Sequence, residues 1–489
     1  MTATTAAANT PSPSMPPPEA SPPPPVPVTA FEKRFKHPPG LLILFFTEMW
    51  ERFSYYGMRG LLKLYMVNYL FVSTRQPKQG QTEGLIPGNP DDVILWGTIK
   101  GMLPNSPAEQ ASLLYGTYTA LVYFTPLFGG MLADRVLGQR KTVVVGGILM
   151  ALGHFVMAFE DWFFIALSLL ILGNGAFKPN ISTQVGNLYA PGDSRRDGAF
   201  TIFYMGINLG AFICNFVCGT LAAVYGWHYG FAAAGFGMLL GLIVYLAGQR
   251  FLAADNLSKT KAAAATTEQK KEPLTKDEWS RVLALVVLCG LNVVFWAVYE
   301  QQGNTMQTWA DEQTVWPVIF GFQIPSTWFQ SFNPLCIIIL APVLDIFWQW
   351  QQRKGTEPTS VTKMAIGCVI LGLSFIVMIV GAQAVGGGKG SMFWPLFCTF
   401  LLTIGELYLS PIGLSLVTKV SPVRIVSMMM GMWFLSSFLG NFLSGAIGVL
   451  YTRWSKESFF LLLTVLGVAA GLAMFAFNKP LKKAIGRAT

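Results

Sequence analysis

One short segment of the sequence combines ionisable and phenolic side chains with apolar surroundings. Residues 48–59 hold two carboxylates, two guanidiniums and two phenols, and largely apolar segments at 41–46 and 61–70 flank them. A charged side chain at the centre of a bilayer costs roughly 2.5 to 3.5 kcal/mol on insertion scales. Charges retained at that cost indicate a functional site, and their chemistry is the binding of charged ligands or the transfer of protons.

The composition indicates that membrane-spanning helices position these residues. Of the 489 residues, 52% are hydrophobic and 12% are charged, and the mean hydropathy is +0.47. A helix of about 20 apolar residues crosses a bilayer. Twelve such stretches occur in two sets of six, at 41–70, 110–131, 142–159, 162–184, 199–223 and 230–250, and at 281–302, 326–350, 361–383, 392–417, 428–450 and 457–477. We therefore predict an all-α membrane protein with twelve transmembrane helices in two six-helix bundles.

The polar segments divide the chain into domains. We predict a disordered, Pro-rich tail at 1–38, an N-terminal bundle at 39–250, a linker at 251–278, a C-terminal bundle at 279–478 and a short tail at 479–489. Lys and Arg concentrate at both ends and in alternate loops, so both termini and the linker are expected in the cytoplasm. The net charge of +9 then reflects the placement of Lys and Arg on the cytoplasmic side. The sequence has no basic patch of the kind that binds nucleic acid, so we do not expect a nucleic-acid partner. The loops at 72–108 and 303–325 are long enough for ordered caps, but the sequence does not decide this.

Counting 1.5 Å per residue along the helices places charges from the two halves at matching depths. Arg59 and Glu300 both lie roughly 27 Å from the cytoplasmic side by this count. Lys178 and Glu406 lie roughly 21 to 24 Å from the outer side. We therefore predict two gate salt bridges between the halves, Arg59 with Glu300 and Lys178 with Glu406, which would close the two ends of a central cavity in turn.

The buried charges balance when all are ionised. The set contains four carboxylates and four cations, namely Glu48, Glu51, Glu300 and Glu406, and Arg52, Arg59, Lys63 and Lys178. Protonation of one carboxylate would weaken a salt bridge, so a proton could drive a gate. A cavity with both signs of charge suits a zwitterionic ligand. A static network that only holds the helices together is the alternative, although eight buried charges are a costly way to obtain packing.

A helical wheel places the charged residues of the first stretch on one face. Glu48, Arg52, Tyr55 and Arg59 fall within about 60° of one another, so this face is expected to line the cavity. Signals for enzyme chemistry are weak, because Gly388-Lys389 lacks the spacing of a phosphate-binding loop and the three histidines lack metal-ligand spacing. We predict neither enzymatic activity nor a cofactor or bound metal.

Three motifs resemble the proton-dependent oligopeptide transporters of the major facilitator superfamily. These are Glu-x-x-Glu-Arg-Phe-x-Tyr-Tyr-Gly at 48–57, a loop signature at 129–138, and Phe-Tyr-Met-Gly-Ile-Asn-Leu-Gly at 203–210. The resemblance covers residues 40–478 and implies the major facilitator superfamily fold. The linker is too short and polar for the two extra helices of many bacterial relatives, so we expect a form without them. Mammalian members carry a histidine near the start of the second helix, where this chain has Gly116.

The resemblance also implies roles for single residues. The proton-coupling residues would be Glu48, Glu51, Arg52 and Glu300. The peptide-binding residues would be Arg59 and Lys178 for the carboxylate end, Asn208, Asn333 and Glu406 for the amino end, Tyr55, Tyr56 and Tyr123 for the backbone, and Trp433 for a side chain.

The sequence therefore predicts a proton-coupled symporter that imports di- and tripeptides by alternating access. We expect a monomer in the lipid bilayer of a plasma or bacterial inner membrane, driven by the proton gradient. One alternative is a transporter of the same fold for another anion or zwitterion, such as nitrate. A second is a non-transporting membrane receptor, which would bind its ligand without concentrative uptake. Retention of the whole motif at 48–57 favours peptides.

Overall fold

The computed structural model describes most of the chain between residues 35 and 485. The described ranges are 35–71, 90–190, 192–255, 274–422 and 425–485. Most of the predicted N-terminal tail, most of the linker and the first part of the loop at 72–108 lie outside them. The predictions for those segments, and the domain boundaries that depend on them, stay predictions.

Long helices form the described chain up to residue 251. They are α2 (Gly40–Tyr65) with η1 (Met66–Leu70), α4 (Pro107–Phe124) with α5 (Pro126–Leu132) and η3 (Ala133–Leu137), α6 (Gln139–Val156), α7 (Phe163–Asn187), α8 (Arg195–Cys214) with η5 (Asn215–Gly219) and α9 (Thr220–Tyr225), and α10 (Trp227–Gly248). Short turns lie at η2 (Pro90–Asp92), α3 (Trp96–Lys100), η4 (Glu160–Trp162) and η6 (Gln249–Phe251).

Helices also dominate the described chain after residue 274. They are α12 (Lys276–Tyr299) with η7 (Glu300–Gln302) and α13 (Thr305–Glu312), η8 (Ser326–Ser331) with α14 (Phe332–Arg353), α15 (Ser360–Val385), α16 (Phe393–Val420), α17 (Val426–Arg453) and α18 (Lys456–Ile485). The start of α12 shows why a helix begins there. Thr275 accepts a hydrogen bond from the Glu278 amide and the Glu278 side chain accepts one from Thr275 N, which together form a capping box.

Within the described residues, ten helices are long and apolar enough to cross a membrane. α2 is not among them because it carries the charged motif at 48–59, and α6 opens with the polar residues Gln139, Arg140 and Lys141. These helices make the chain an integral membrane protein. The predicted total of twelve spans stays a prediction.

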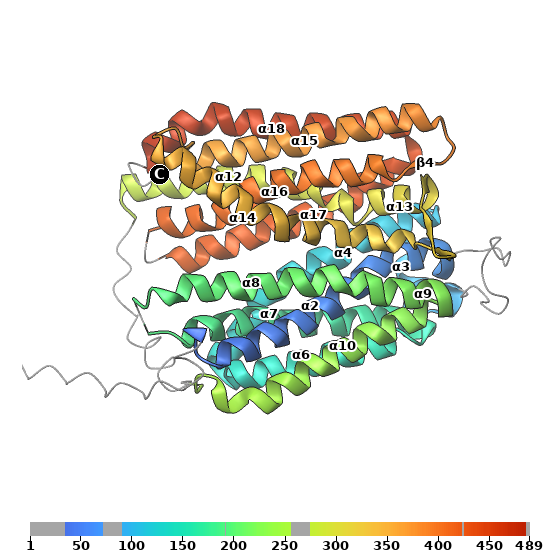
Figure 1. Ribbon diagram of the computed structural model, residues 1–489, viewed down its shortest axis with the longest axis horizontal. Helices are drawn as coiled ribbons and strands as arrows, with labels where there is room; N and C mark the ends of the chain where they lie inside the picture. The colour runs from blue at the N-terminus through green and yellow to red at the C-terminus, as the bar shows by residue number, and fades with distance from the viewer. Residues whose placement is uncertain (1–34, 72–89, 191, 256–273, 423–424, 486–489) are drawn as a thin grey trace, which may run out of the picture.

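Two separate hydrophobic cores divide the helices into two bundles. The first core draws its buried residues from Leu41 to Leu252, and the second from Val282 to Met474. Figure 1 shows the first bundle, with α2, α6, α7, α8 and α10, below the second bundle, with α12, α14, α15, α16 and α18. α2 begins and α18 ends at the left of this view. We call that end the termini side and the opposite end the far side.

The loop at 303–325 is ordered on the far side, a point that the sequence left open. α13 follows α12 after the turn η7, and three short strands, β1 to β3, come after α13 in this loop. β1 (Thr314–Val315) pairs in parallel with β4 (Gly390–Ser391), which ties this loop to the connection between α15 and α16. β2 (Val318–Ile319) and β3 (Phe322–Gln323) form an antiparallel hairpin.

Glycines allow the two bundles to touch closely where α4 meets α17. A Cβ atom added at Gly116 would lie only 2.5 Å from the Gly445 amide nitrogen and 2.9 Å from the Asn441 carbonyl oxygen. Such distances are too short for real side chains, so a larger residue at position 116 would force the helices apart. Mammalian members of the family that the sequence resembles carry a histidine at this position. The contact with α17 leaves no room for a histidine at Gly116 in this protein.

Candidate functional site

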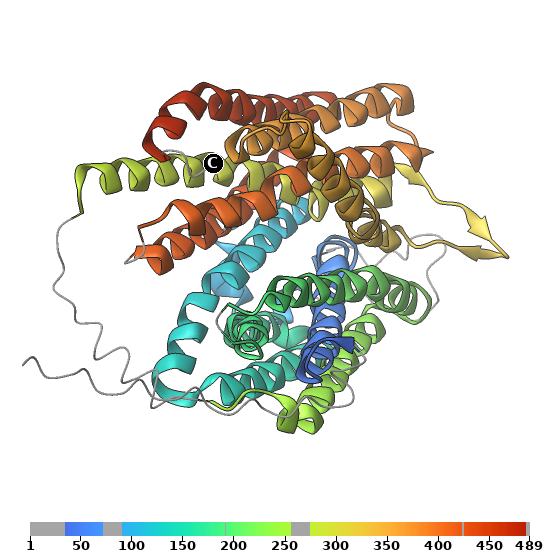
Figure 2. The ribbon, with the colours of Figure 1, turned by 60° about the vertical axis from the view of Figure 1, so that its left-hand side comes forward.

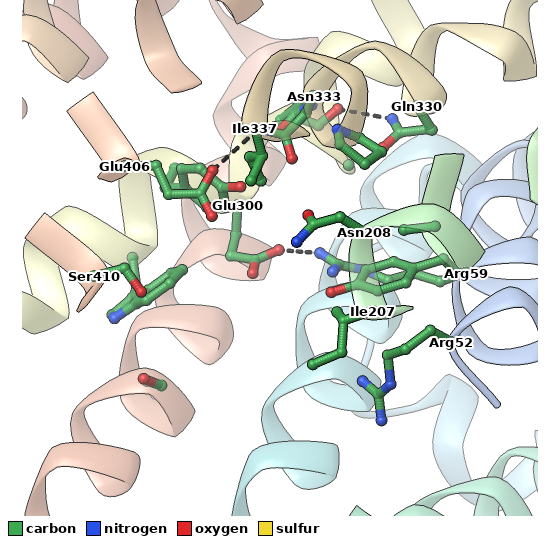
Figure 3. A pocket seen from close by; sticks show the side chains of 18 of the residues that line it. Arg52, Arg59, Ile207, Asn208, Glu300, Gln330, Asn333, Ile337, Glu406 and Ser410 are labelled. Atoms are coloured by element: carbon green, nitrogen blue, oxygen red, sulfur yellow. Dashed lines mark hydrogen bonds and ion pairs between the residues drawn. The ribbon is translucent and has the colours of Figure 1, made fainter. Parts of the chain in front are cut away.

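A cavity of about 290 Å³ lies between the two bundles. Both bundles supply its lining, which includes Arg52, Tyr56, Arg59, Tyr123, Lys178, Asn208, Glu300, Asn333, Glu406 and Trp433. These are ten of the thirteen residues to which the sequence assigned a role. Figure 3 shows Arg52, Arg59 and Asn208 on one side of the cavity and Glu300, Asn333 and Glu406 on the other.

The charges of the lining are segregated by bundle. Its cations, Arg52, Arg59 and Lys178, come from α2 and α7 of the first bundle. Its carboxylates, Glu300 and Glu406, come from η7 and α16 of the second. A ligand that spans the cavity would therefore meet opposite charges at its two ends.

Arg59 and Glu300 form an ion pair that links the bundles. Glu300 is 2% exposed, and the Arg59 Nε group also donates to the Tyr115 hydroxyl over 2.8 Å. Glu300 lies directly after the last residue of α12, where the helix gives way to the 3₁₀ turn η7 before α13 begins. The depth count from sequence placed these two residues at one level, and the break in the helix was not foreseen.

Lys178 and Glu406 both face the cavity, but the structure does not pair them. The Lys178 ammonium lies 4.8 Å from the centre of the Tyr123 ring, a cation–π arrangement within the first bundle. Glu406 accepts a hydrogen bond of 3.1 Å from Asn333 Nδ2, which lies in its own bundle. The depth of a residue along its helix does not determine how far it lies from a residue on another helix. The predicted salt bridge between Lys178 and Glu406 is therefore absent from this conformation, and it remains a prediction for another conformation of the protein.

Glu48, Glu51 and Arg52 form a compact cluster in the first bundle. Arg52 Nε lies 3.1 Å from Glu48 Oε1 and also contacts Glu51, while Asn174 Nδ2 donates to Glu51 Oε1 over 3.3 Å. Only Arg52 of these three charged residues reaches the cavity lining. Among the described residues, Glu48 Oε2 and Arg52 Nη2 have no hydrogen-bond partner although both are buried. Such atoms carry a desolvation cost. Glu48 Oε2 can still accept a proton or a hydrogen bond from water, whereas Arg52 Nη2 can only donate one.

The face of α2 that lines the cavity differs from the predicted one. Arg52, Tyr56, Arg59 and Gly60 line it, at a spacing of four, three and one residues. Tyr55 is buried within the protein and stacks edge-on against Tyr56, away from the lining. Arg52 and Arg59 of the predicted face line the cavity, whereas Tyr55 and Glu48 do not, because a wheel gives angular positions but not the direction of the second bundle. The roles of Tyr55 in peptide binding and of Glu48 in proton coupling stay predictions.

Several residues that line the cavity were not predicted from the sequence. Polar examples are Tyr204, Asn215, Gln302, Gln330, Ser410 and Ser437. Gln330 donates to the Gln302 carbonyl oxygen at 3.1 Å and to Gln307 Oε1 at 2.8 Å, so an amide network forms the far-side wall of the cavity. A usable signal was the occurrence of amides on both sides of the segment at 303–325, namely Gln301 and Gln302 before it and Gln330 and Asn333 after it.

Comparison with known proteins decides the family. The family model described as POT family matches residues 140–269 and 252–461, which is more than half of the chain. The chain belongs to the POT family. Its membership gives it the major facilitator fold and makes it a transporter rather than an enzyme.

Individual POT relatives match along nearly the whole chain. The peptide transporter YePEPT of Yersinia enterocolitica is 36% identical over 85% of this chain and 88% of its own length. A di-/tripeptide transporter of Lactococcus lactis is 31% identical over 92% of this chain and 97% of its own. A crystal structure of a mutant of the peptide transporter POT in complex with alafosfalin superposes with a TM-score of 0.77, at 34% identity, over 94% of this chain and 97% of the other.

Proposed function

We propose that this POT-family transporter is a proton-coupled symporter that imports di- and tripeptides by alternating access. The segregation of charge across the cavity is the observation that carries the proposal, because a peptide backbone is a zwitterion with its charges at opposite ends. The names of the POT relatives support the substrate class. In this proposal the protein works as a monomer, without a cofactor, in a plasma or bacterial inner membrane.

The cavity suggests how a peptide would be oriented. Arg59 and Lys178 would bind its carboxylate, and Glu406, held by Asn333, would bind its amine. Asn208 would assist at the amino end, while Tyr56, Tyr123 and Trp433 would contact the backbone and a side chain. At about 290 Å³, the cavity lies near the lower limit of about 300 Å³ for typical small-molecule pockets, which favours short peptides.

The Arg59–Glu300 pair suggests a route for proton coupling. A proton on Glu300 would remove the charge that holds Arg59, so Arg59 would be released toward the peptide carboxylate. The same event would break a link between the bundles, and the far side could then open. The cluster of Glu48, Glu51 and Arg52 would hold or relay protons behind the cavity.

The positions of the contacts between bundles suggest the conformational state. On the far side, Asn68 bonds Asp311, Trp328 bonds Thr220, and Arg453 pairs with Glu109. We infer that the far side is closed in this arrangement. If both termini are cytoplasmic, as the distribution of Lys and Arg predicts, the structure corresponds to an inward-facing state.

Uptake into proteoliposomes tests the proposal. The purified protein should accumulate a labelled dipeptide under an inward proton gradient, and a protonophore should abolish the accumulation. Competition by unlabelled di- and tripeptides, but not by nitrate, is the expected pattern. Binding without accumulation would instead identify a receptor. Accumulation of nitrate with no uptake of any dipeptide would reassign the substrate.

A further inference from the structure

The hairpin of β2 and β3 presents an exposed apolar tip on the far side. Phe320 is fully exposed, and Val318 and Ile319 are 60% and 48% exposed. Val315, at the base, is also exposed. Apolar side chains that gather at one projecting tip need a partner, because water solvates them poorly.

The turn of this hairpin retains a residue that the backbone disfavours. Phe320 and Gly321 have φ angles of +51° and +79°, and they separate the paired residues Ile319 and Phe322. A two-residue turn with two positive φ angles favours Asn-Gly or Asp-Gly, since a bulky side chain is strained there. A phenylalanine at this position indicates that its side chain has a use outside the hairpin.

The rest of the hairpin is fixed, so its tip has a defined direction. Trp316 Nε1 donates to the Ala310 carbonyl oxygen at 2.7 Å, and Gln323 Nε2 donates to the Trp316 carbonyl oxygen at 2.8 Å. Phe322 packs near Trp328, which bonds Thr220 of the first bundle. Figure 2 shows the two strands as yellow arrows that extend sideways, beyond the helices, at the right of the view.

Two features of the surroundings identify the partner as lipid. Residues 313–331 contain no Asp, Glu, Lys, Arg or His, whereas a surface facing bulk water would ordinarily carry charge. Exposed aromatic side chains also lie at the far-side ends of the helices, namely Phe159, Trp162, Tyr225, Tyr229, Phe393 and Trp454. Aromatic belts of this kind mark the level of the lipid headgroups. The hairpin projects sideways at this same end.

We propose that the tip formed by Val318, Ile319 and Phe320 rests in the headgroup region of the far-side leaflet. The hairpin thus extends the footprint of the second bundle onto the membrane surface. The attachment would fix the loop between α13 and α14 relative to the bilayer.

Spin labelling in lipid nanodiscs tests the proposal. The six native cysteines are all buried, so a nitroxide on V318C reports on the tip while Phe320 stays in place. Collision rates with oxygen, which enters lipid, and with a water-soluble nickel chelate give the depth of the label. A label on K389C, at an exposed position of the far-side loop after α15, is the matched aqueous control.

We expect the V318C label to favour oxygen over the nickel chelate by several-fold more than the K389C label does. Adding F320N, which suits the positive φ, should move the V318C label toward the aqueous value. Equal accessibility of the V318C and K389C labels would overturn the proposal. Dipolar broadening between V318C labels in nanodiscs that hold two copies would also overturn it, because a second protein would then be the partner.

Discussion

Glu300 and Glu406 face one cavity from one bundle, but they are held in different ways. Glu300 pairs with Arg59 across the cavity, whereas Glu406 accepts a hydrogen bond from Asn333 within its own bundle. Lys178, the cation expected opposite Glu406, lies against an aromatic ring. The comparison indicates that Glu300 links the two bundles through Arg59. At the level of Glu406, by contrast, Lys178 stays available to a ligand.

Removal of the Glu300 charge should have the largest effect. Loss of one partner of a buried ion pair costs about 3 to 5 kcal/mol, and Glu300→Gln leaves Arg59 without its carboxylate. We expect proton-driven uptake to fall by about a hundredfold or more, since 1.4 kcal/mol corresponds to a factor of ten. Counterflow exchange should be affected much less, because it requires no net proton movement.

Paired assays in the same proteoliposomes check this prediction. Glu109→Gln is a matched control, because Glu109 also forms an ion pair between the bundles but at the far-side rim, with Arg453. Equal loss of uptake and exchange in Glu300→Gln would remove Glu300 from the coupling role.

Lys178→Ala should weaken the binding of the peptide without destabilising the protein. The ammonium has no carboxylate partner among the described residues, so its removal should not lower the melting temperature. Binding of a dipeptide in detergent should weaken by about ten- to a hundredfold, as expected from the roughly 1.5 to 3 kcal/mol of a hydrogen bond between charged groups. Lys178→Arg should restore part of the affinity. A fall in melting temperature as large as the loss of affinity would show that Lys178 has a structural role.

Gly116→Leu should prevent closure of the far side without touching a charge. An added side chain would meet the backbone of Gly445 and Asn441, and overpacking costs about 1 to 3 kcal/mol. Spin labels at Met102 and Lys389, which are exposed on the far side of the two bundles, should move apart in double electron–electron resonance. Gly97→Leu is the control, because no atom lies within 4 Å of its added Cβ. An unchanged label distance in Gly116→Leu would contradict the close contact.

Glu109→Gln should have the smallest effect. Arg453 is more than half exposed, and an ion pair open to solvent contributes little because water and salt screen it. The same label pair should show less than a fivefold shift in the open population, and 1 M salt should reduce the difference from wild type. A shift in the open population as large as that of Glu300→Gln would show that the pair of Glu109 and Arg453 at the rim, and not the pair of Arg59 and Glu300, mainly holds the far side closed.

The sequence predicted the fold well where apolar length was the only requirement. The stretches at 361–383 and 457–477 correspond to α15 and α18, and the division into two bundles matches the two cores. Interruptions within helices were not predicted, such as the π turns η1 and η5 and the 3₁₀ turn η7. These depend on tertiary contacts rather than on local composition.

The site was predictable in its residues but not in its contacts. Charge in an apolar helix identified Arg59, Lys178, Glu300 and Glu406, and all four line the cavity. Their pairing depended on how far apart the bundles stand, which a count along one helix does not contain. Uncharged lining residues such as Gln330 gave a weaker signal in the sequence than the charges did, because an amide at a helix start has ordinary structural uses.

The break at Glu300 also bears on the speed of transport. α12 stops at Tyr299 and α13 starts at Thr305, so the backbone between them can bend without breaking the regular hydrogen bonds of either helix. Release of Glu300 would then free this turn from Arg59 of the first bundle, while α12 and α13 keep their places in the core of the second. The barrier to opening would then depend on the conformational change of this short turn. Substitutions at Gly303 or Asn304, which lie in it, should therefore alter turnover even though neither residue carries charge.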